Sequence, residues 1–133
     1  MNTPSVELLG LAAAAALGLV HIILASHSAS IQRGYRWTAG ARDDSQAPLS
    51  GVAGRLARAN ANYLETFPFF AAATLAVLII GTHSEWAKWG IFLYIGGRII
   101  YLPLYAFGVF MVRSMVWNVA TAGIAAIYVA LFL

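Results

Sequence analysis

Four long apolar windows dominate the chain, and shorter polar connections separate them. The windows cover residues 6–27, 53–80, 86–107 and 115–133. Each is long enough to cross a hydrocarbon core about 30 Å thick as a helix. Because backbone groups in lipid must bond within their own segment, we expect a single all-α domain built as a bundle of four transmembrane helices.

Composition supports this assignment and narrows the chemistry. The 133 residues are 61% hydrophobic and 10% charged, with a mean hydropathy of +0.76. Such a chain is too apolar for a soluble globule and too short for a second domain. The sequence contains no cysteine, so disulfides, thiolate metal sites and a protein thiol nucleophile are excluded. Any sulfur chemistry has to use a thiol that a cofactor or substrate supplies.

Charge is distributed unevenly between the connections. Residues 28–52 form the only long connection, rich in glycine and charge, and we expect an ordered loop at a membrane face. The basic residues in or beside this loop and the connection before the fourth window are Arg33, Arg36, Arg42, Arg55, Arg58 and Arg113. Only Lys88 lies near the remaining connection. The positive-inside rule therefore predicts that residues 28–52 face the cytoplasm and that both termini lie outside.

A polar stripe enters the second window. Arg55, Arg58, Asn62 and Glu65 fall within an arc of roughly 80° on one helix face. Ionisable side chains inside a membrane cost about 2.5–3.5 kcal/mol each, so they mark a bundle interior or a water-filled site. A simpler interpretation is an ion network that only holds helices together.

The third window carries a second stripe. Arg98, Tyr101 and Tyr105 share a face roughly 60° wide. Arg98 keeps its charge and needs an acceptor, and Glu65 is the only intramembrane carboxylate available, so we expect the two to be neighbours. The two stripes together offer arginines for carboxylates, Asn62 and Glu65 for amide and ammonium groups, and phenols for the remaining polar atoms of a small anionic molecule.

Arg113 and Ser114 introduce the fourth window, with Ser114 as the expected N-cap. A cation beside a helix N-terminus can stabilise a thiolate, and the Ser114 hydroxyl can donate to the same sulfur. The simpler interpretation is a charged anchor followed by a cap. Nearby Trp117 is interpreted, like Trp86 and Trp89, as an aromatic residue of the membrane interface.

These residues resemble a known pattern. The spacing R-x-x-R-A-x-x-N-x-x-E-x-x-P is similar to the signature of the MAPEG superfamily, the membrane-associated proteins in eicosanoid and glutathione metabolism. Its positions in this chain are Arg55, Arg58, Ala59, Asn62, Glu65 and Pro68. The stripe from Arg98 to Tyr105 and the pair Arg113-Ser114 are further similarities. The stretch Gly40-Ala41-Arg42-Asp43 resembles a bacterial branch related to microsomal glutathione transferases, which implies the bacterial inner membrane.

The resemblance implies a homotrimer of four-helix bundles that binds glutathione, without a metal, between neighbouring subunits near the cytoplasmic face. It implies that Arg113 activates the thiol with help from Ser114. The contacts to the tripeptide that it implies are Arg58, Asn62, Glu65, Tyr101 and Tyr105, with Arg33 or Arg36 from the neighbouring subunit. Arg55 and Arg98 are implied to have structural, supporting roles.

Two functions of different class stay open. The first is a glutathione-dependent membrane transferase or peroxidase that acts on lipophilic electrophiles or hydroperoxides from the bilayer. The second is a non-catalytic accessory or lipid-binding subunit of the same fold, and a membrane isomerase that uses the same thiol is a third interpretation. No nucleotide, metal or nucleophile motif occurs. The partners that the resemblance implies are further copies of the chain, membrane lipids and a lipophilic small molecule, and no nucleic acid is expected.

Overall fold

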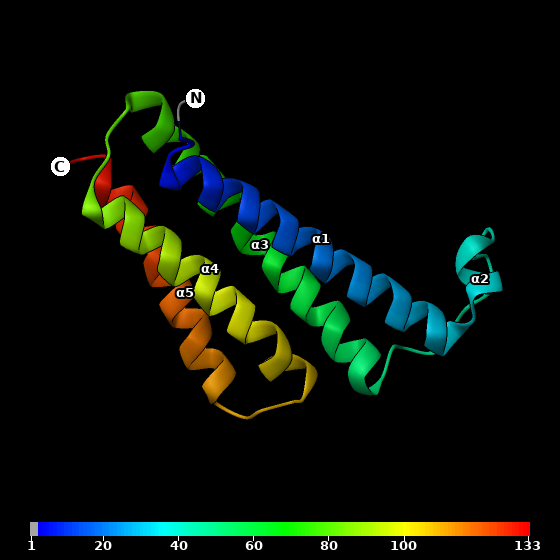
Figure 1. Ribbon diagram of the computed structural model, residues 1–133. Coiled ribbons are helices and arrows are strands. Elements are labelled where there is room, and N and C mark those ends of the chain that lie inside the picture. Colours follow the sequence, from blue (N-terminus) through cyan, green and yellow to red (C-terminus); the bar gives the residue numbers. More distant parts are fainter. Residues whose placement is uncertain (1–2) are drawn as a thin grey trace.

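A computed structural model describes residues 3–133 as four long helices and one short helix (Figure 1). Their bounds are α1 Val6–Arg33, α2 Tyr35–Ala39, α3 Gly51–Ile80, α4 Glu85–Ala106 and α5 Val112–Ala130. The long helices run side by side, and both described ends of the chain lie at the same end of the bundle (Figure 1). The all-α fold predicted from the apolar windows is confirmed.

Helix α1 extends beyond the expected end near residue 27, and the expected loop of residues 28–52 contains α2. Residues 28–33 hold no glycine or proline, so the helix continues until Gly34, whose φ of 90° ends it. At 1.5 Å per residue, the 28 residues of α1 span about 42 Å, which is longer than the hydrocarbon core. The last turns of α1 therefore reach past the core.

Two helix starts also differ from expectation. The spacing of Thr82 and Glu85 predicts a capping box at the start of α4, but the cap is Ser84, whose hydroxyl accepts a hydrogen bond from the Ala87 backbone N–H at 3.2 Å. Helix α5 begins at Val112, so Ser114 lies inside its first turn and is not the N-cap. The residue before α5 is Met111, with a φ of 60°. Arg113 and Ser114 consequently lie within the first helical turn.

Small residues bring the helices close together. A Cβ atom on Gly90 would lie 2.5 Å from the Gly123 carbonyl oxygen, and one on Gly123 would lie 2.6 Å from that of Gly90. Helices α4 and α5 therefore touch backbone to backbone. Helix α1 packs mainly on α3, where Gly18 faces the Tyr63 ring and the Tyr63 hydroxyl donates to the Ala14 carbonyl.

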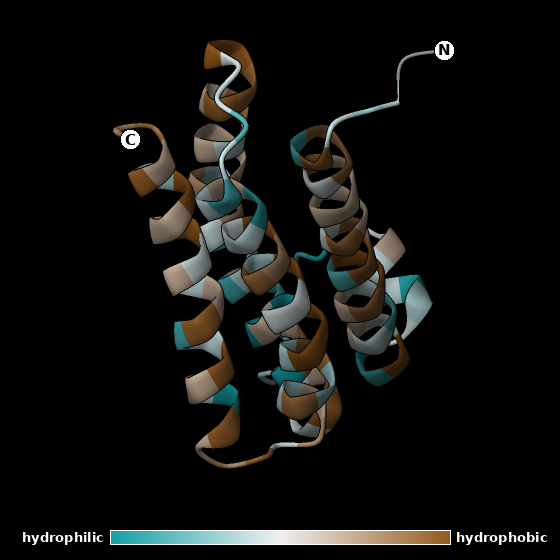
Figure 2. Cartoon of the chain, turned by 60° about the vertical axis from the view of Figure 1, so that its left-hand side comes forward, coloured by the Kyte–Doolittle hydropathy of each residue, from teal (hydrophilic) through white to brown (hydrophobic). Residues whose placement is uncertain are grey.

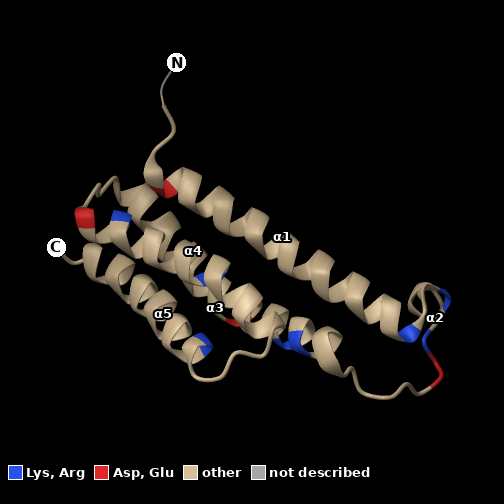
Figure 3. Ribbon diagram, turned by 60° about the horizontal axis from the view of Figure 1, so that its bottom comes forward, with Lys and Arg blue, Asp and Glu red and all other residues tan. Residues whose placement is uncertain are grey.

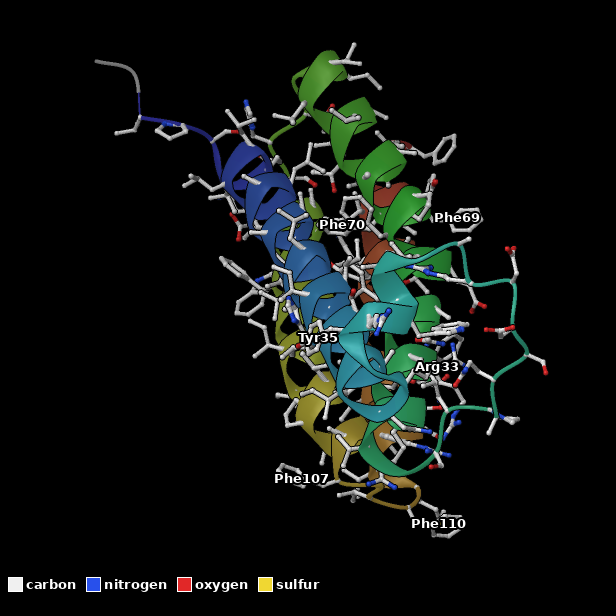
Figure 4. All side chains as sticks on the ribbon, turned by 90° about the vertical axis from the view of Figure 1, so that its right-hand side faces the viewer. Arg33, Tyr35, Phe69, Phe70, Phe107 and Phe110 are labelled. Atoms are coloured by element: carbon white, nitrogen blue, oxygen red, sulfur yellow. The ribbon has the colours of Figure 1, made fainter. Side chains whose placement is uncertain are left out.

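Hydrophobic residues occur along all four long helices (Figure 2), and many large ones are exposed on the outside of the bundle, as a lipid-facing surface requires. All four long helices are long and apolar enough to cross a membrane. Phe70 lies inside the bundle, whereas Phe69 points away from it and Phe107 and Phe110 project from the connection between α4 and α5 (Figure 4). The chain is an integral membrane protein.

Candidate functional site

Polar side chains from three helices surround a cavity of about 310 Å³ at the end of the bundle that carries the α4–α5 connection. Its lining residues are Asn62 from α3, Tyr101 and Tyr105 from α4, and Arg113, Ser114, Trp117 and Asn118 from α5. Five of these are residues that the two stripes and the start of the fourth window singled out. The structure therefore brings together in one protomer much of the predicted site.

Two arginines and two phenols form a ladder beside this cavity. The Arg113 guanidinium carbon lies 4.8 Å from the centre of the Tyr105 ring. The Tyr105 and Tyr101 rings are 5.4 Å apart, because a four-residue spacing places them one above the other on α4. The Arg98 guanidinium carbon lies 5.2 Å from the centre of the Tyr101 ring. Cation–π contacts hold both positive charges against the tyrosines, so the cavity is electropositive.

Arg98 is fully buried, and its partners differ from the predicted one. Its guanidinium donates to Asn62 Oδ1 at 2.7 Å and to the Thr66 hydroxyl. The rings of Tyr63 and Tyr94 each lie 5.7 Å from it. Within residues 3–133, Arg98 makes no ion pair, so the predicted pairing with Glu65 is wrong for the protomer.

Helix rotation explains this difference. Asn62 and Thr66 are four residues apart and both turn toward α4, whereas Glu65 is rotated by about 100° from Thr66. Glu65 is exposed on the protomer and borders a second, largely apolar groove of about 400 Å³. The other lining residues of this groove are Thr66, Phe69, Trp117, Thr121, Ile124, Ala125 and Tyr128.

The remaining predicted contacts do not line the polar cavity of this protomer. Arg58 is exposed, with its Nη1 atom close to Gly54 at the start of α3. Arg33 and Arg36 border a separate space of about 540 Å³ around α2 and the loop after it. Their predicted role depends on a neighbouring subunit, so it stays a prediction.

Arg55 braces the same end of the bundle. Its Nε atom donates to the carbonyl of Ala106, the last residue of α4, at 2.7 Å. A Cβ atom on Gly108 would lie 3.6 Å from the Arg55 side chain, so the arginine also lies against the α4–α5 connection. Arg55 thus joins α3 to the segment that leads to Arg113.

Sequence reasoning missed three residues of this region. Thr66 lies one turn after Asn62, and that four-residue spacing was the signal for a second acceptor to Arg98. Trp117 and Asn118 lie one turn after Arg113 and Ser114, on the same face of α5. The place of Trp117 at the membrane interface stays a prediction, and the residue also lies where the polar cavity meets the apolar groove.

This arrangement suits an anionic, hydrogen-bonding ligand next to an apolar one. Arginine, phenol, hydroxyl and amide groups dominate the polar cavity, and residues 3–133 contain no cluster of three or more His, Asp or Glu side chains that could hold a metal ion. Fold and site define a four-helix integral membrane protein with an electropositive cavity at one end.

The MAPEG family model matches residues 10–133, so the chain belongs to the MAPEG family. No match was found among curated proteins or among solved structures. Membership associates the chain with glutathione and eicosanoid metabolism at membranes.

Proposed function

We propose that this protein is a glutathione-dependent membrane transferase or peroxidase that acts on lipophilic electrophiles or hydroperoxides. One observation carries the proposal: Arg113 stands over Tyr105 at the edge of a cavity that also holds Ser114 and Asn62, and the MAPEG family is associated with glutathione. The cavity volume of about 310 Å³ lies at the small end of the range for ligand pockets.

Arg113 has the chemistry to hold a thiolate. It lies in the first turn of α5, where the helix dipole also favours negative charge. The Ser114 hydroxyl, which borders the same cavity, can donate a hydrogen bond to the sulfur. A guanidinium keeps its proton, so the thiol proton leaves to solvent and Arg113 stabilises the charge that remains.

The second substrate would occupy the apolar groove. Phe69, Ile124 and Tyr128 line this groove, and Trp117 joins it to the polar cavity. In a conjugation, the sulfur bonds to the electrophilic carbon and the leaving group departs with the bonding electrons. In a peroxidase reaction, two glutathiones become one disulfide while the hydroperoxide becomes an alcohol and water. Both reactions need a thiolate beside an apolar surface.

The other proposed contacts to glutathione require an assembly of several subunits. In the proposed homotrimer, Arg58, Glu65 and a neighbour's Arg33 or Arg36 complete the glutathione site between subunits. Arg58 and Glu65 are exposed on the isolated protomer, as residues at such an interface should be. The proposed location is the bacterial inner membrane, with the site on the cytoplasmic side.

Thiolate difference spectroscopy on the purified protein with glutathione tests this function. We expect the wild type to show the ultraviolet thiolate band. Arg113→Leu should lose the band while the glutathione dissociation constant rises only modestly. Arg58→Leu should do the reverse, because it removes a carboxylate partner and leaves the group beside the sulfur.

Lys88→Leu is the matched control. Lys88 donates to Glu85 at 2.6 Å in the first turn of α4, at the end of the bundle opposite the polar cavity, so both the band and the affinity should stay as in the wild type. If the wild type shows neither a thiolate band nor protection from heating by millimolar glutathione, the enzyme proposal falls. The non-catalytic accessory or lipid-binding subunit would then take its place.

A further inference from the structure

Asn62 stands between Arg98 and the polar cavity. The amide accepts a hydrogen bond from Arg98 Nη1 at 2.7 Å, and the same residue lines the cavity. A guanidinium has donors only, so the amide atom that faces Arg98 must be the oxygen. The chemistry of the partner thus assigns the orientation of the amide, which is often ambiguous in other settings.

The amide nitrogen then faces the other way. Among residues 3–133, no acceptor receives a hydrogen bond from Asn62 Nδ2, and this atom is not enclosed by the protein. An NH₂ group is therefore available to whatever occupies the cavity. It can only donate, so its complement is an oxygen acceptor rather than an ammonium group.

Arg98 is held firmly enough to impose this orientation. It is fully buried, it also donates to the Thr66 hydroxyl, and three tyrosine rings surround its guanidinium. In the described part of the chain no carboxylate offsets its charge. Its field therefore adds to the preference for a negatively charged group in the cavity.

We propose that Arg98 is a positioning residue that holds the Asn62 amide with its NH₂ group toward the cavity. In this orientation Asn62 donates a hydrogen bond to a carboxylate or peptide carbonyl oxygen of the ligand. The identity of that ligand as glutathione rests on the function proposed above. The inference assigns Asn62 to an acceptor group of the tripeptide, whereas the polar stripe alone left amide and ammonium groups open.

Two variants test the anchoring without any ligand. Asn62→Asp keeps an oxygen for Arg98 and turns the contact into an ion pair, whereas Asn62→Leu leaves the buried guanidinium without this acceptor. We expect the apparent melting temperature of the Asp variant to equal or exceed that of the wild type, and that of the Leu variant to fall clearly. A Leu variant as stable as the wild type, or an Asp variant as unstable as Leu, would overturn the anchoring.

Glutathione binding then tests which kind of ligand group the Asn62 amide contacts. Asn62→Ala removes one hydrogen bond and should raise the dissociation constant about tenfold. Asn62→Asp places a carboxylate oxygen against the acceptor oxygen of the ligand. The dissociation constant of this variant should therefore be at least about ten times higher than that of Asn62→Ala. Equal losses in the two variants would overturn the proposed donor role.

Asn118→Asp is the matched control for charge. Asn118 lines the same cavity, and its Nδ2 group donates one hydrogen bond to the Ser114 carbonyl at 3.0 Å rather than being turned to the cavity by a buried arginine. The substitution adds the same negative charge to the cavity and leaves the Asn62 amide in place, so binding should weaken much less than in Asn62→Asp. If wild-type protein binds no glutathione while the stability results follow expectation, the proposed function and the ligand part of this inference fall, and the anchoring by Arg98 stands.

Discussion

Glu65 is the single carboxylate in the middle of α3, and the protomer gives it no cation. Arg98, which was expected to hold it, instead bonds two neutral oxygens on a neighbouring face of the same helix. A neutral acceptor suffices because three tyrosine rings share the stabilisation of the guanidinium. Glu65 is thereby left free to meet a group that arrives from outside the protomer.

Glu65→Gln should separate binding from stability. Because Glu65 is exposed and unpaired within the described residues, the free energy of unfolding should change by less than about 0.5 kcal/mol. Glutathione affinity should fall about tenfold, since a charge-assisted contact is lost. Thermal unfolding in detergent and a glutathione titration measure the two effects. A large loss of stability would show that Glu65 pairs with a cation of another copy.

At the scale of helices, the α4–α5 pair depends on glycine at its crossing. Gly90 and Gly123 place their backbones in contact, and Gly97 receives the Ala120 side chain 3.0 Å from where its own Cβ would be. Such close approach is typical of membrane helices, where packing replaces the hydrophobic effect as the force that joins helices. The same pair of helices carries the Tyr101–Tyr105–Arg113 side of the cavity.

Gly123→Ala should destabilise the bundle by about 1–3 kcal/mol, because the new methyl group would press on backbone atoms of Gly90 and Tyr94 that cannot turn aside. Gly96→Ala is the matched control on α4, since a Cβ there has nothing within 4 Å. The control should be neutral or slightly stabilising. Thermal unfolding of the two variants tests this difference, and equal melting temperatures would contradict the close crossing.

Arg55→Gln should loosen the end of α4. The substitution removes the donor that Arg55 Nε provides to the Ala106 carbonyl, and the freed carbonyl lies where the helix already lacks partners. Amide hydrogen exchange should accelerate in residues 106–112, with a weaker thiolate band as the consequence for Arg113. Arg42→Gln removes a similar contact to the Thr38 carbonyl and should leave both signals unchanged. Unaltered amide hydrogen exchange in Arg55→Gln would contradict the proposed role of Arg55 in holding the end of α4.

Elements were easier to predict than their contacts, and the reason is physical. Apolar windows of membrane length define helices by themselves, so all four spans could be predicted. The five residues of α2 have no such period, and the sequence contains no signal for them beyond the flanking glycines. Contacts between helices depend on their rotation, which is why Glu65 was chosen for Arg98 in place of Asn62 and Thr66.

On the scale of the whole molecule, the two ends of the bundle differ in charge. Arginines gather at the end that carries α2 and at the start of α5 (Figure 3). The opposite end carries the described chain ends, Glu85 and a buried Glu7 that contacts His83 at 3.4 Å. A membrane potential and the positive-inside rule favour the arginine-rich end in the cytoplasm. The candidate site lies toward that end, so this orientation would give a cytoplasmic thiol access to it.

Labelling of single cysteines tests this orientation cleanly, because the natural chain has none. We choose Ser45 in the exposed loop after α2 and Glu85 at the opposite end, whose side chain is 71% exposed. Ser84 is avoided because it caps α4. A membrane-impermeant maleimide added to intact cells should label Glu85→Cys and reach Ser45→Cys only after the membrane is permeabilised. The opposite pattern would place the arginine-rich end outside and separate the site from cytoplasmic glutathione.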